Sequence, residues 1–181
     1  MRIGIDISQT AYKNTGVANY LNSLVEHLLD QDKENEYVLF YSSLRRPLPV
    51  NELTSLRVNG LNSKVKIKAF KFPPLALHLL WNKLHIAPIE WFIGDVDVFI
   101  TSDWTEPPTK KAKKATILYD LIVYKYPNET DKKIISTQKA KIRWVKKESD
   151  LVFTISESSK KDIIEILDIE ESKIRVIYPG N

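Results

Sequence analysis

The sequence predicts an α/β domain built on a mostly parallel sheet with helices on both faces. Two observations lead to this prediction. Short apolar stretches alternate along the chain with segments of helical periodicity, and the connections between them are long enough for parallel crossovers. The length of 181 residues is close to that of one domain, and no repeat, low-complexity tract or linker divides it. We therefore expect residues 1–181 to form one structural unit.

The first part of the chain has the pattern strand, helix, strand and edge strand. Arg2 to Ile7 alternates apolar and other residues, which is typical of a short strand. After the loop Ser8 to Thr15, apolar residues recur at helical spacing, so Gly16 would lie at a helix entrance. Tyr37 to Tyr41 is a continuous apolar run that indicates a strand covered on both faces. Lys64 to Lys68 keeps its lysines on one side, which predicts the edge of the sheet.

Helices and strands keep alternating through the rest of the chain. The expected helices are Leu75 to Leu84, a piece from Pro88 to Ile93, a helix capped by Thr130 that runs to Ser149, and one from Ser156 or Glu157 to Leu167. The expected strands are Val96 to Thr101, Ala115 to Tyr119, Leu151 to Ile155 and Ile174 to Tyr178. With right-handed crossovers, this order predicts a Rossmann-like, doubly wound sheet.

The composition excludes several classes of function. The chain has no cysteine, so it holds no disulfide, thiolate metal site or cysteine nucleophile, and we expect a cytoplasmic protein. The N-terminus lacks the apolar stretch of a signal peptide, and Pro73 to Phe92 is too polar to span a bilayer. The net charge of +4 is a mild bias toward phosphate-bearing partners. Aromatic and basic residues do not assemble into a platform, so we expect no nucleic-acid binding.

Candidate site residues are those in loops at the carboxyl ends of the predicted strands, where open α/β sheets bind ligands. These loops are Ser8 to Gly16, Ser102 to Lys114, Tyr119 to Thr130, Ser156 to Ser159, and Pro179 onward. Gly16 would let backbone amides approach an anion at a helix N-terminus, or it simply makes a tight turn. Asp103, Glu106 and Asp120 are candidates for a base or a ligand of a sugar hydroxyl. We expect Asp6 to cap its loop.

Other polar motifs favour structural roles. Asp95-Val96-Asp97 precedes a strand and so faces the wrong edge for a metal site, and the three histidines show no metal-pair spacing. The sequence has neither a dinucleotide fingerprint nor a Walker loop, and we expect no metal and no bound cofactor. One side of the helix from 130 to 149 is basic. This basic side indicates a helix face that is exposed to solvent, and the alternative is a face that binds a membrane surface. Its basic residues are Lys132, Lys139, Arg143 and Lys146.

Ordered segments along the whole chain resemble the N-terminal domain of glycosyltransferase family 4, the group 1 enzymes with the GT-B fold. The segments are MRIGIDIS, TGVANYLNSLVEHL, NEYVLFY, DVFITSDWTEPP, ATILYDLIVYKYP, SDLVFTISESSKKDII and KIRVIYPGN. The resemblance implies an acceptor-binding half, while a C-terminal half would hold most of the nucleotide sugar and transfer would need no metal. Pro179-Gly180 resembles the hinge entry. The donor half is expected to lie outside these 181 residues or to act in trans.

The resemblance also assigns site residues. Gly16 matches the loop that approaches the donor phosphates, which makes it a donor-binding candidate. Tyr119 and Asp120 stand where the family has a histidine-aspartate-leucine triplet, so they are the catalytic candidates. Because an unperturbed phenol has a pKa near 10, Tyr119 cannot copy the proton exchange of an imidazole near neutral pH.

The expected function is that of the acceptor-side domain of a retaining glycosyltransferase, inactive by itself. Such an enzyme moves a sugar from a nucleotide-sugar donor to a carbohydrate or lipid-linked acceptor, in the cytoplasm or at the inner face of the membrane. The alternative is a non-catalytic, Rossmann-like binding module that acts through protein contacts.

Overall fold

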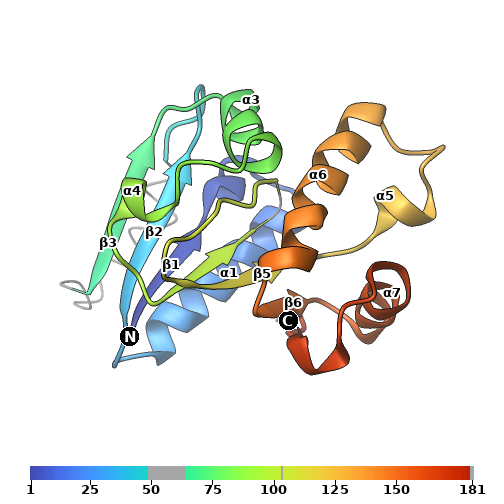
Figure 1. The fold of residues 1–181 in the computed structure, drawn as a ribbon. Helices are drawn as coiled ribbons and strands as arrows, with labels where there is room; N and C mark the ends of the chain where they lie inside the picture. The colour runs from blue at the N-terminus through green and yellow to red at the C-terminus, as the bar shows by residue number, and fades with distance from the viewer. Residues whose placement is uncertain (49–63, 103, 180–181) are drawn as a thin grey trace.

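Seven parallel strands form the centre of the molecule in the computed structural model, which describes residues 1–48, 64–102 and 104–179 (Figure 1). The strands are β1 (Arg2–Asp6), β2 (Glu36–Ser42), β3 (Val65–Phe70), β4 (Val98–Thr101), β5 (Lys113–Ile117), β6 (Leu151–Thr154) and β7 (Ile174–Val176). Their order across the sheet is β3-β2-β1-β4-β5-β6-β7, and all six pairings are parallel. The predicted fold class is confirmed: the sheet is Rossmann-like.

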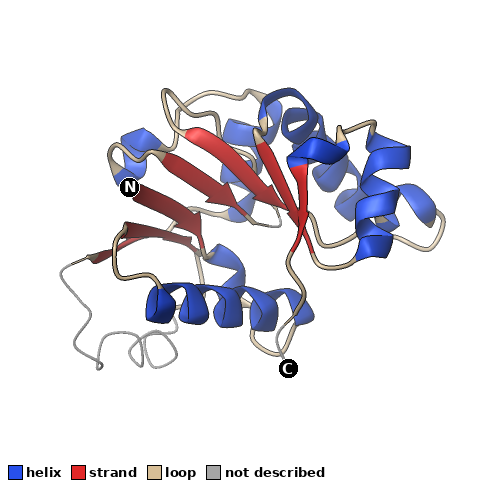
Figure 2. Ribbon diagram, turned by 90° about the horizontal axis from the view of Figure 1, so that it is seen from below, coloured by secondary structure: helices blue, strands red, loops and turns tan. Residues whose placement is uncertain are grey.

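The long helix α1 (Gly16–Gln31) lies along one face of the sheet (Figure 2). It begins as expected at Gly16, because the Thr15 hydroxyl accepts a hydrogen bond from the Ala18 amide at 3.2 Å. Its buried side chains, among them Leu21 and Val25, pack against Ile5 of β1 and its neighbours. Burial of this apolar stripe holds the first βα unit together.

Short and long helical segments cover the opposite face (Figure 2). They are α3 (Pro74–Leu77), which continues into the π-helical segment η2 (His78–Lys83), and α4 (Glu90–Ile93), α6 (Lys132–Glu148) and α7 (Glu157–Leu167). Trp81, Phe40 and Phe99 form the centre of the core beneath η2 and α4. Gly4 is required there, because a Cβ at this position would lie 2.7 Å from the Phe99 side chain.

Several predicted boundaries differ from the observed ones. The cap of α6 is Asp131 and not Thr130, because the Asp131 carboxylate accepts hydrogen bonds from the amides of Lys133 and Ile134. The Thr130 hydroxyl donates instead to the Tyr126 carbonyl. The predicted helix Leu75 to Leu84 is α3 plus η2, and the piece expected from Pro88 starts at Glu90. Local side-chain hydrogen bonds decide such ends, and periodicity does not register them.

The edge-strand and turn interpretations are confirmed. β3 lies at one edge of the sheet with Lys66 and Lys68 exposed and Ile67 half-buried. Asp97 has a structural role, since its carboxylate accepts a hydrogen bond from the Arg2 amide at 2.7 Å. No helix in the described part of the chain combines the length and apolar character that crossing a membrane requires.

Buried charges connect β5 to α6. Lys114 is 3% exposed and lies 3.2 Å from the Glu106 carboxylate and 3.0 Å from that of Glu148. Glu148 also contacts His85 at 3.0 Å. Thr101 donates a 2.6 Å hydrogen bond to Glu106. We refer to Glu106, Lys114, Glu148 and His85 as the buried charge cluster, in which Glu106 and Lys114 are buried and Glu148 and His85 are half-buried.

Candidate functional site

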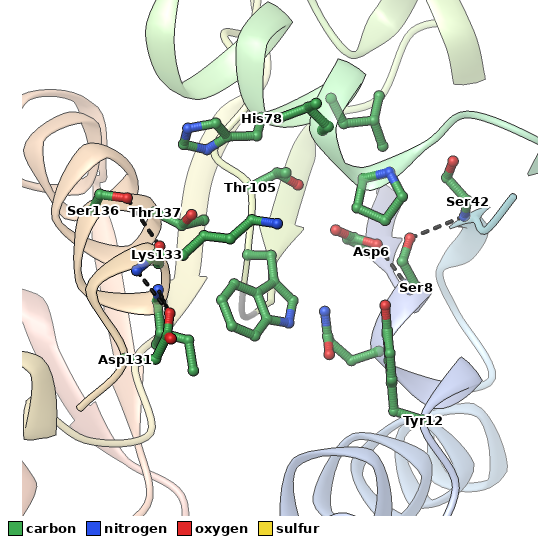
Figure 3. A pocket seen from close by; sticks show the side chains of 16 residues that line it. Asp6, Ser8, Tyr12, Ser42, His78, Thr105, Asp131, Lys133, Ser136 and Thr137 are labelled. Atoms are coloured by element: carbon green, nitrogen blue, oxygen red, sulfur yellow. Dashed lines mark hydrogen bonds between the residues drawn. The ribbon is translucent and has the colours of Figure 1, made fainter. Parts of the chain in front are cut away.

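A cavity of about 430 Å³ lies at the carboxyl edge of the sheet, beside the point where the strand order reverses between β1 and β4. α1 leads away from β1 in one direction, and the chain returns at β4 on its other side, which is the topology that opens a crevice in α/β sheets. We call this space the edge cavity (Figure 3). Its lining residues are Asp6, Ser8, Gln9, Tyr12, Ser42, Pro74, Leu75, Leu77, His78, Trp104, Thr105, Asp131, Lys133, Ile134, Ser136 and Thr137.

Asp6 and Ser8 form the part of the edge cavity contributed by β1 and the loop after it. The Asp6 carboxylate accepts a 2.9 Å hydrogen bond from the Ser8 amide, so the expected capping role is confirmed. The Ser8 hydroxyl accepts another from the Ser42 amide at 3.0 Å, which ties the ends of β1 and β2 together. Burial raises the pKa of Asp6, although the bonds from Ser8 and the charge of Lys141 act in the opposite direction.

His78 lies on the wall formed by α3 and η2. Its ring points toward the edge cavity and toward α6 (Figure 3), and its Nδ1 lies 3.1 Å from the Asn82 amide nitrogen. Burial and the nearby charge of Lys83 lower the pKa of His78. The imidazole is therefore neutral at physiological pH.

The facing wall is the first two turns of α6. The Lys133 side chain reaches from this helix toward the middle of the edge cavity, and Ser136 and Thr137 lie beside it (Figure 3). In the described ranges, no carboxylate lies within ion-pair distance of the Lys133 ammonium. Asp131 lines the cavity too, but its carboxylate caps the helix.

Apolar groups complete the lining. Trp104 comes from the loop after β4, Tyr12 from the loop before α1, and Leu75 and Leu77 from α3. A concave site of this size with a few polar groups among apolar surfaces is typical of small-molecule binding. No group of three or more metal-ligating side chains occurs among the residues that the structure describes.

The residues predicted from the resemblance lie outside the lining of the edge cavity. Gly16 is exposed at the first turn of α1. Tyr119 is buried, and its ring meets that of Tyr20 edge to face at 5.5 Å. Asp120 is exposed and accepts a 3.0 Å hydrogen bond from the Ile122 amide. Tyr119 and Asp120 thus follow each other after β5, but the Tyr119 side chain is buried and the Asp120 side chain is exposed.

The other two acidic candidates have separate outcomes. Glu106 is fully buried in the buried charge cluster and does not face the cavity. Asp103 lies outside the described residues.

Sequence reasoning missed His78, Trp104 and Lys133 as lining residues. Trp104 stands in the predicted ligand-binding loop Ser102 to Lys114, whose candidate residues in the sequence are the acidic Asp103 and Glu106. His78 follows β3, and the predicted ligand-binding loops do not include those after β2 and β3, although all strands of a parallel sheet end at the same edge. The signal was therefore present in the strand order. Lys133 reaches the cavity because the start of α6 lies at this edge, which is a tertiary contact that sequence pattern does not show.

No model of a protein family matches the sequence. No curated protein matches it either. The plain conclusion from fold and comparisons is an α/β domain with a seven-stranded, all-parallel, Rossmann-like sheet.

Proposed function

We propose that this chain is the acceptor-side domain of a retaining glycosyltransferase that resembles family 4. In this proposal the edge cavity holds a carbohydrate acceptor, and a second half of the enzyme supplies the nucleotide sugar. The observation that carries the proposal is the cavity itself, which stands at the switch point of a Rossmann-like sheet and combines polar and aromatic lining.

The lining chemistry suits a sugar ring. Hydroxyl groups need partners that both donate and accept, and Gln9, Ser8 and Thr105 offer both. The apolar C–H faces of a sugar need flat apolar surface, which Trp104 and Tyr12 offer. A site with these two features discriminates by hydrogen bonding while apolar contact supplies affinity.

A single half is expected to be inactive. Transfer needs donor and acceptor fixed together, and positioning of this kind is worth ~7 to 11 kcal/mol of barrier. Gly16, at the N-terminus of α1, is the proposed approach point for the donor phosphates, since helix N-termini attract anions. The donor-binding half would belong to the same enzyme or join in trans.

The test of the acceptor site compares two tryptophans. We expect Trp104→Ala to abolish binding of mono- and oligosaccharides measured by saturation-transfer NMR. Trp91→Ala, at a 64% exposed tryptophan outside the cavity lining, should leave binding unchanged. If no carbohydrate binds to the unaltered chain, the non-catalytic binding module becomes the better proposal. Equal loss in both variants would also count against an acceptor in this cavity.

The catalytic roles proposed for Tyr119 and Asp120 rest on the resemblance and are tested in the complete enzyme. Asp120→Asn should lower turnover far more than it lowers stability, because Asp120 is exposed and its local hydrogen bond can be kept by asparagine. Tyr119→His separates two cases. A gain in turnover means that the tyrosine merely weakens the ordinary chemistry, and a loss means that the phenol has a role of its own.

For a lipid-linked acceptor we propose peripheral contact with an anionic membrane through α3 and η2. Leu75 and Leu79 are 70% and 53% exposed one helical turn apart. Between Lys71 and Gly94 the sole acidic residue is Glu90, which is buried. Such a face suits an anionic interface. Replacing both leucines by serine should reduce sedimentation with phosphatidylglycerol vesicles. Leu44→Ser, at an exposed leucine after β2, should have no effect.

A further inference from the structure

The side chain of Asn82 determines how the ring of His78 can bind a ligand. Asn82 is fully buried, and its oxygen accepts a 2.9 Å hydrogen bond from the Glu106 amide. Its nitrogen donates a 2.8 Å hydrogen bond to the Trp104 carbonyl. These two backbone partners fix which end of the amide is oxygen and which is nitrogen, independently of His78.

This orientation sets the tautomer of His78. The second N–H of the Asn82 amide points at Nδ1 of His78, 3.1 Å away, so Nδ1 must be the acceptor. A neutral imidazole that accepts at Nδ1 carries its proton at Nε2. In the described part of the chain, Nε2 has no hydrogen-bond partner. The ring of His78, which lines the edge cavity, therefore carries its N–H donor at Nε2.

Lys133 supplies a second donor from the opposite wall. Its side chain points toward the middle of the edge cavity (Figure 3), and no described carboxylate pairs with it. The other charged groups of the lining are Asp6 and Asp131, and both carboxylates already accept hydrogen bonds from backbone amides. Lys83 follows His78 on its own segment, and together with burial it keeps the ring neutral.

We propose that the edge cavity recognises an anionic group carried by its sugar ligand, a carboxylate or a phosphate, with His78 Nε2–H and the Lys133 ammonium as the donors. The sugar part of this inference rests on the proposed function. The anionic part follows from the two donors, neither of which has a partner among the described residues, since N–H groups bind a charged acceptor more strongly than a hydroxyl.

The binding test uses four probes with the full chain in calorimetric titrations: glucose, glucuronate, glucose 6-phosphate and inorganic phosphate. At least one charged sugar should bind about tenfold or more tightly than glucose. Lys133→Met should remove most of this preference. Lys132→Met is the matched control, because this exposed neighbour on the same helix does not line the cavity. His78→Phe should weaken binding of the charged sugar, and the exposed His27→Phe should not.

The outcomes separate the inference from the proposed function. Equal binding of glucose and both charged sugars, unaffected by Lys133→Met, would overturn the inference and leave carbohydrate binding standing. Phosphate binding as tight as that of glucose 6-phosphate would support the anion site and count against a sugar acceptor. Absence of binding by all four probes at millimolar concentration would overturn both.

A second measurement tests the donor without any ligand. Long-range ¹H–¹⁵N correlation spectra report which ring nitrogen of a histidine carries the proton. We expect His78 to be the Nε2–H tautomer at neutral pH and to titrate below the ordinary histidine value of about 6.5. A proton at Nδ1 in the unaltered protein would overturn the assignment, whatever the binding data show.

Discussion

Two groups of polar side chains, each with a lysine and a histidine, lie at opposite ends of the contact between η2 and α6, and they differ in whether these side chains have partners in the protein. In the buried charge cluster, Lys114 contacts two carboxylates and His85 contacts Glu148 at 3.0 Å. The His85 ring also stacks on Trp144 at 3.5 Å between centroids. At the edge cavity, His78 and Lys133 come from the same two segments, yet their outward donors have no partner in the described chain.

This difference separates structural charges from charges available to a ligand. A buried ion whose partner is removed costs several kcal/mol, so the fold depends on the pairing of the buried members of the cluster, Glu106 and Lys114. A charge on an exposed side chain such as Lys133 contributes little to folding and retains its binding capacity. The predictions below test that division, beginning with the largest effect.

The largest effect is expected in the buried charge cluster. Lys114→Met leaves the fully buried Glu106 carboxylate without its counter-ion and should lower the free energy of unfolding by about 3 to 5 kcal/mol. The measurement is urea denaturation followed by circular dichroism. Lys113→Met is the control: its side chain is 74% exposed, so the loss should stay below about 1 kcal/mol. Similar losses in both variants would contradict the division.

The next effect concerns Asp131, which lines the edge cavity but whose carboxylate serves the fold. Asp131→Ala removes the cap of α6 and should cost about 1 kcal/mol of unfolding free energy. Asp131→Asn keeps an acceptor oxygen and should cost less. Thr130→Ala should be nearly neutral, because Thr130 is not the cap. A larger loss for Thr130→Ala than for Asp131→Ala would restore the sequence-based boundary.

The two regions should also respond to pH with opposite signs. Burial raises the pKa of Asp6, so the unfolded chain loses this proton first and folding stability falls as pH rises above about 3.9 toward the raised pKa. Burial also acts to raise the pKa of Glu148, but hydrogen bonds from Lys114 and His85 outweigh it and lower the pKa. Its contribution is present above about 4.3 and is lost as pH falls.

Denaturation of two isosteric variants across a pH series checks these signs. Relative to the unaltered protein, Asp6→Asn should become more stable as pH rises through that window, whereas Glu148→Gln should become less stable. Parallel curves for the two variants would show that Asp6 and Glu148 have similar surroundings, contrary to the structure.

The smallest effect on stability is expected at Lys133. Lys133→Met should change the unfolding free energy by no more than about 0.5 kcal/mol, and so should Lys132→Met, because both side chains are exposed. We expect the two variants to differ only in ligand binding, which Lys133→Met should weaken and Lys132→Met should leave unchanged. A loss of several kcal/mol for Lys133→Met would show that its ammonium is part of the fold.

Much of the fold could be predicted from local pattern. Apolar alternation in β1, the apolar run of β2 and the lysines of β3 each located a strand, and Thr15-Gly16 located the start of α1. These features depend on neighbours in the chain, so a sequence window contains them. The ends of η2 and α6 were less predictable, because the π-helical turn and the choice of Asp131 over Thr130 depend on local hydrogen bonds that apolar periodicity does not register.

The sequence by itself determined the class of the domain, its strand and helix order, and the edge at which a ligand would bind, because periodicity and parallel topology follow from residues close in the chain. Only the tertiary structure decided which side chains meet at that edge. His78, Trp104 and Lys133 are up to 55 residues apart in numbering, and they line one cavity because α3, α6 and the loop after β4 converge there. It also buried Glu106 beside Lys114. Such contacts between distant residues depend on how the helices and strands pack together, which the sequence pattern does not show.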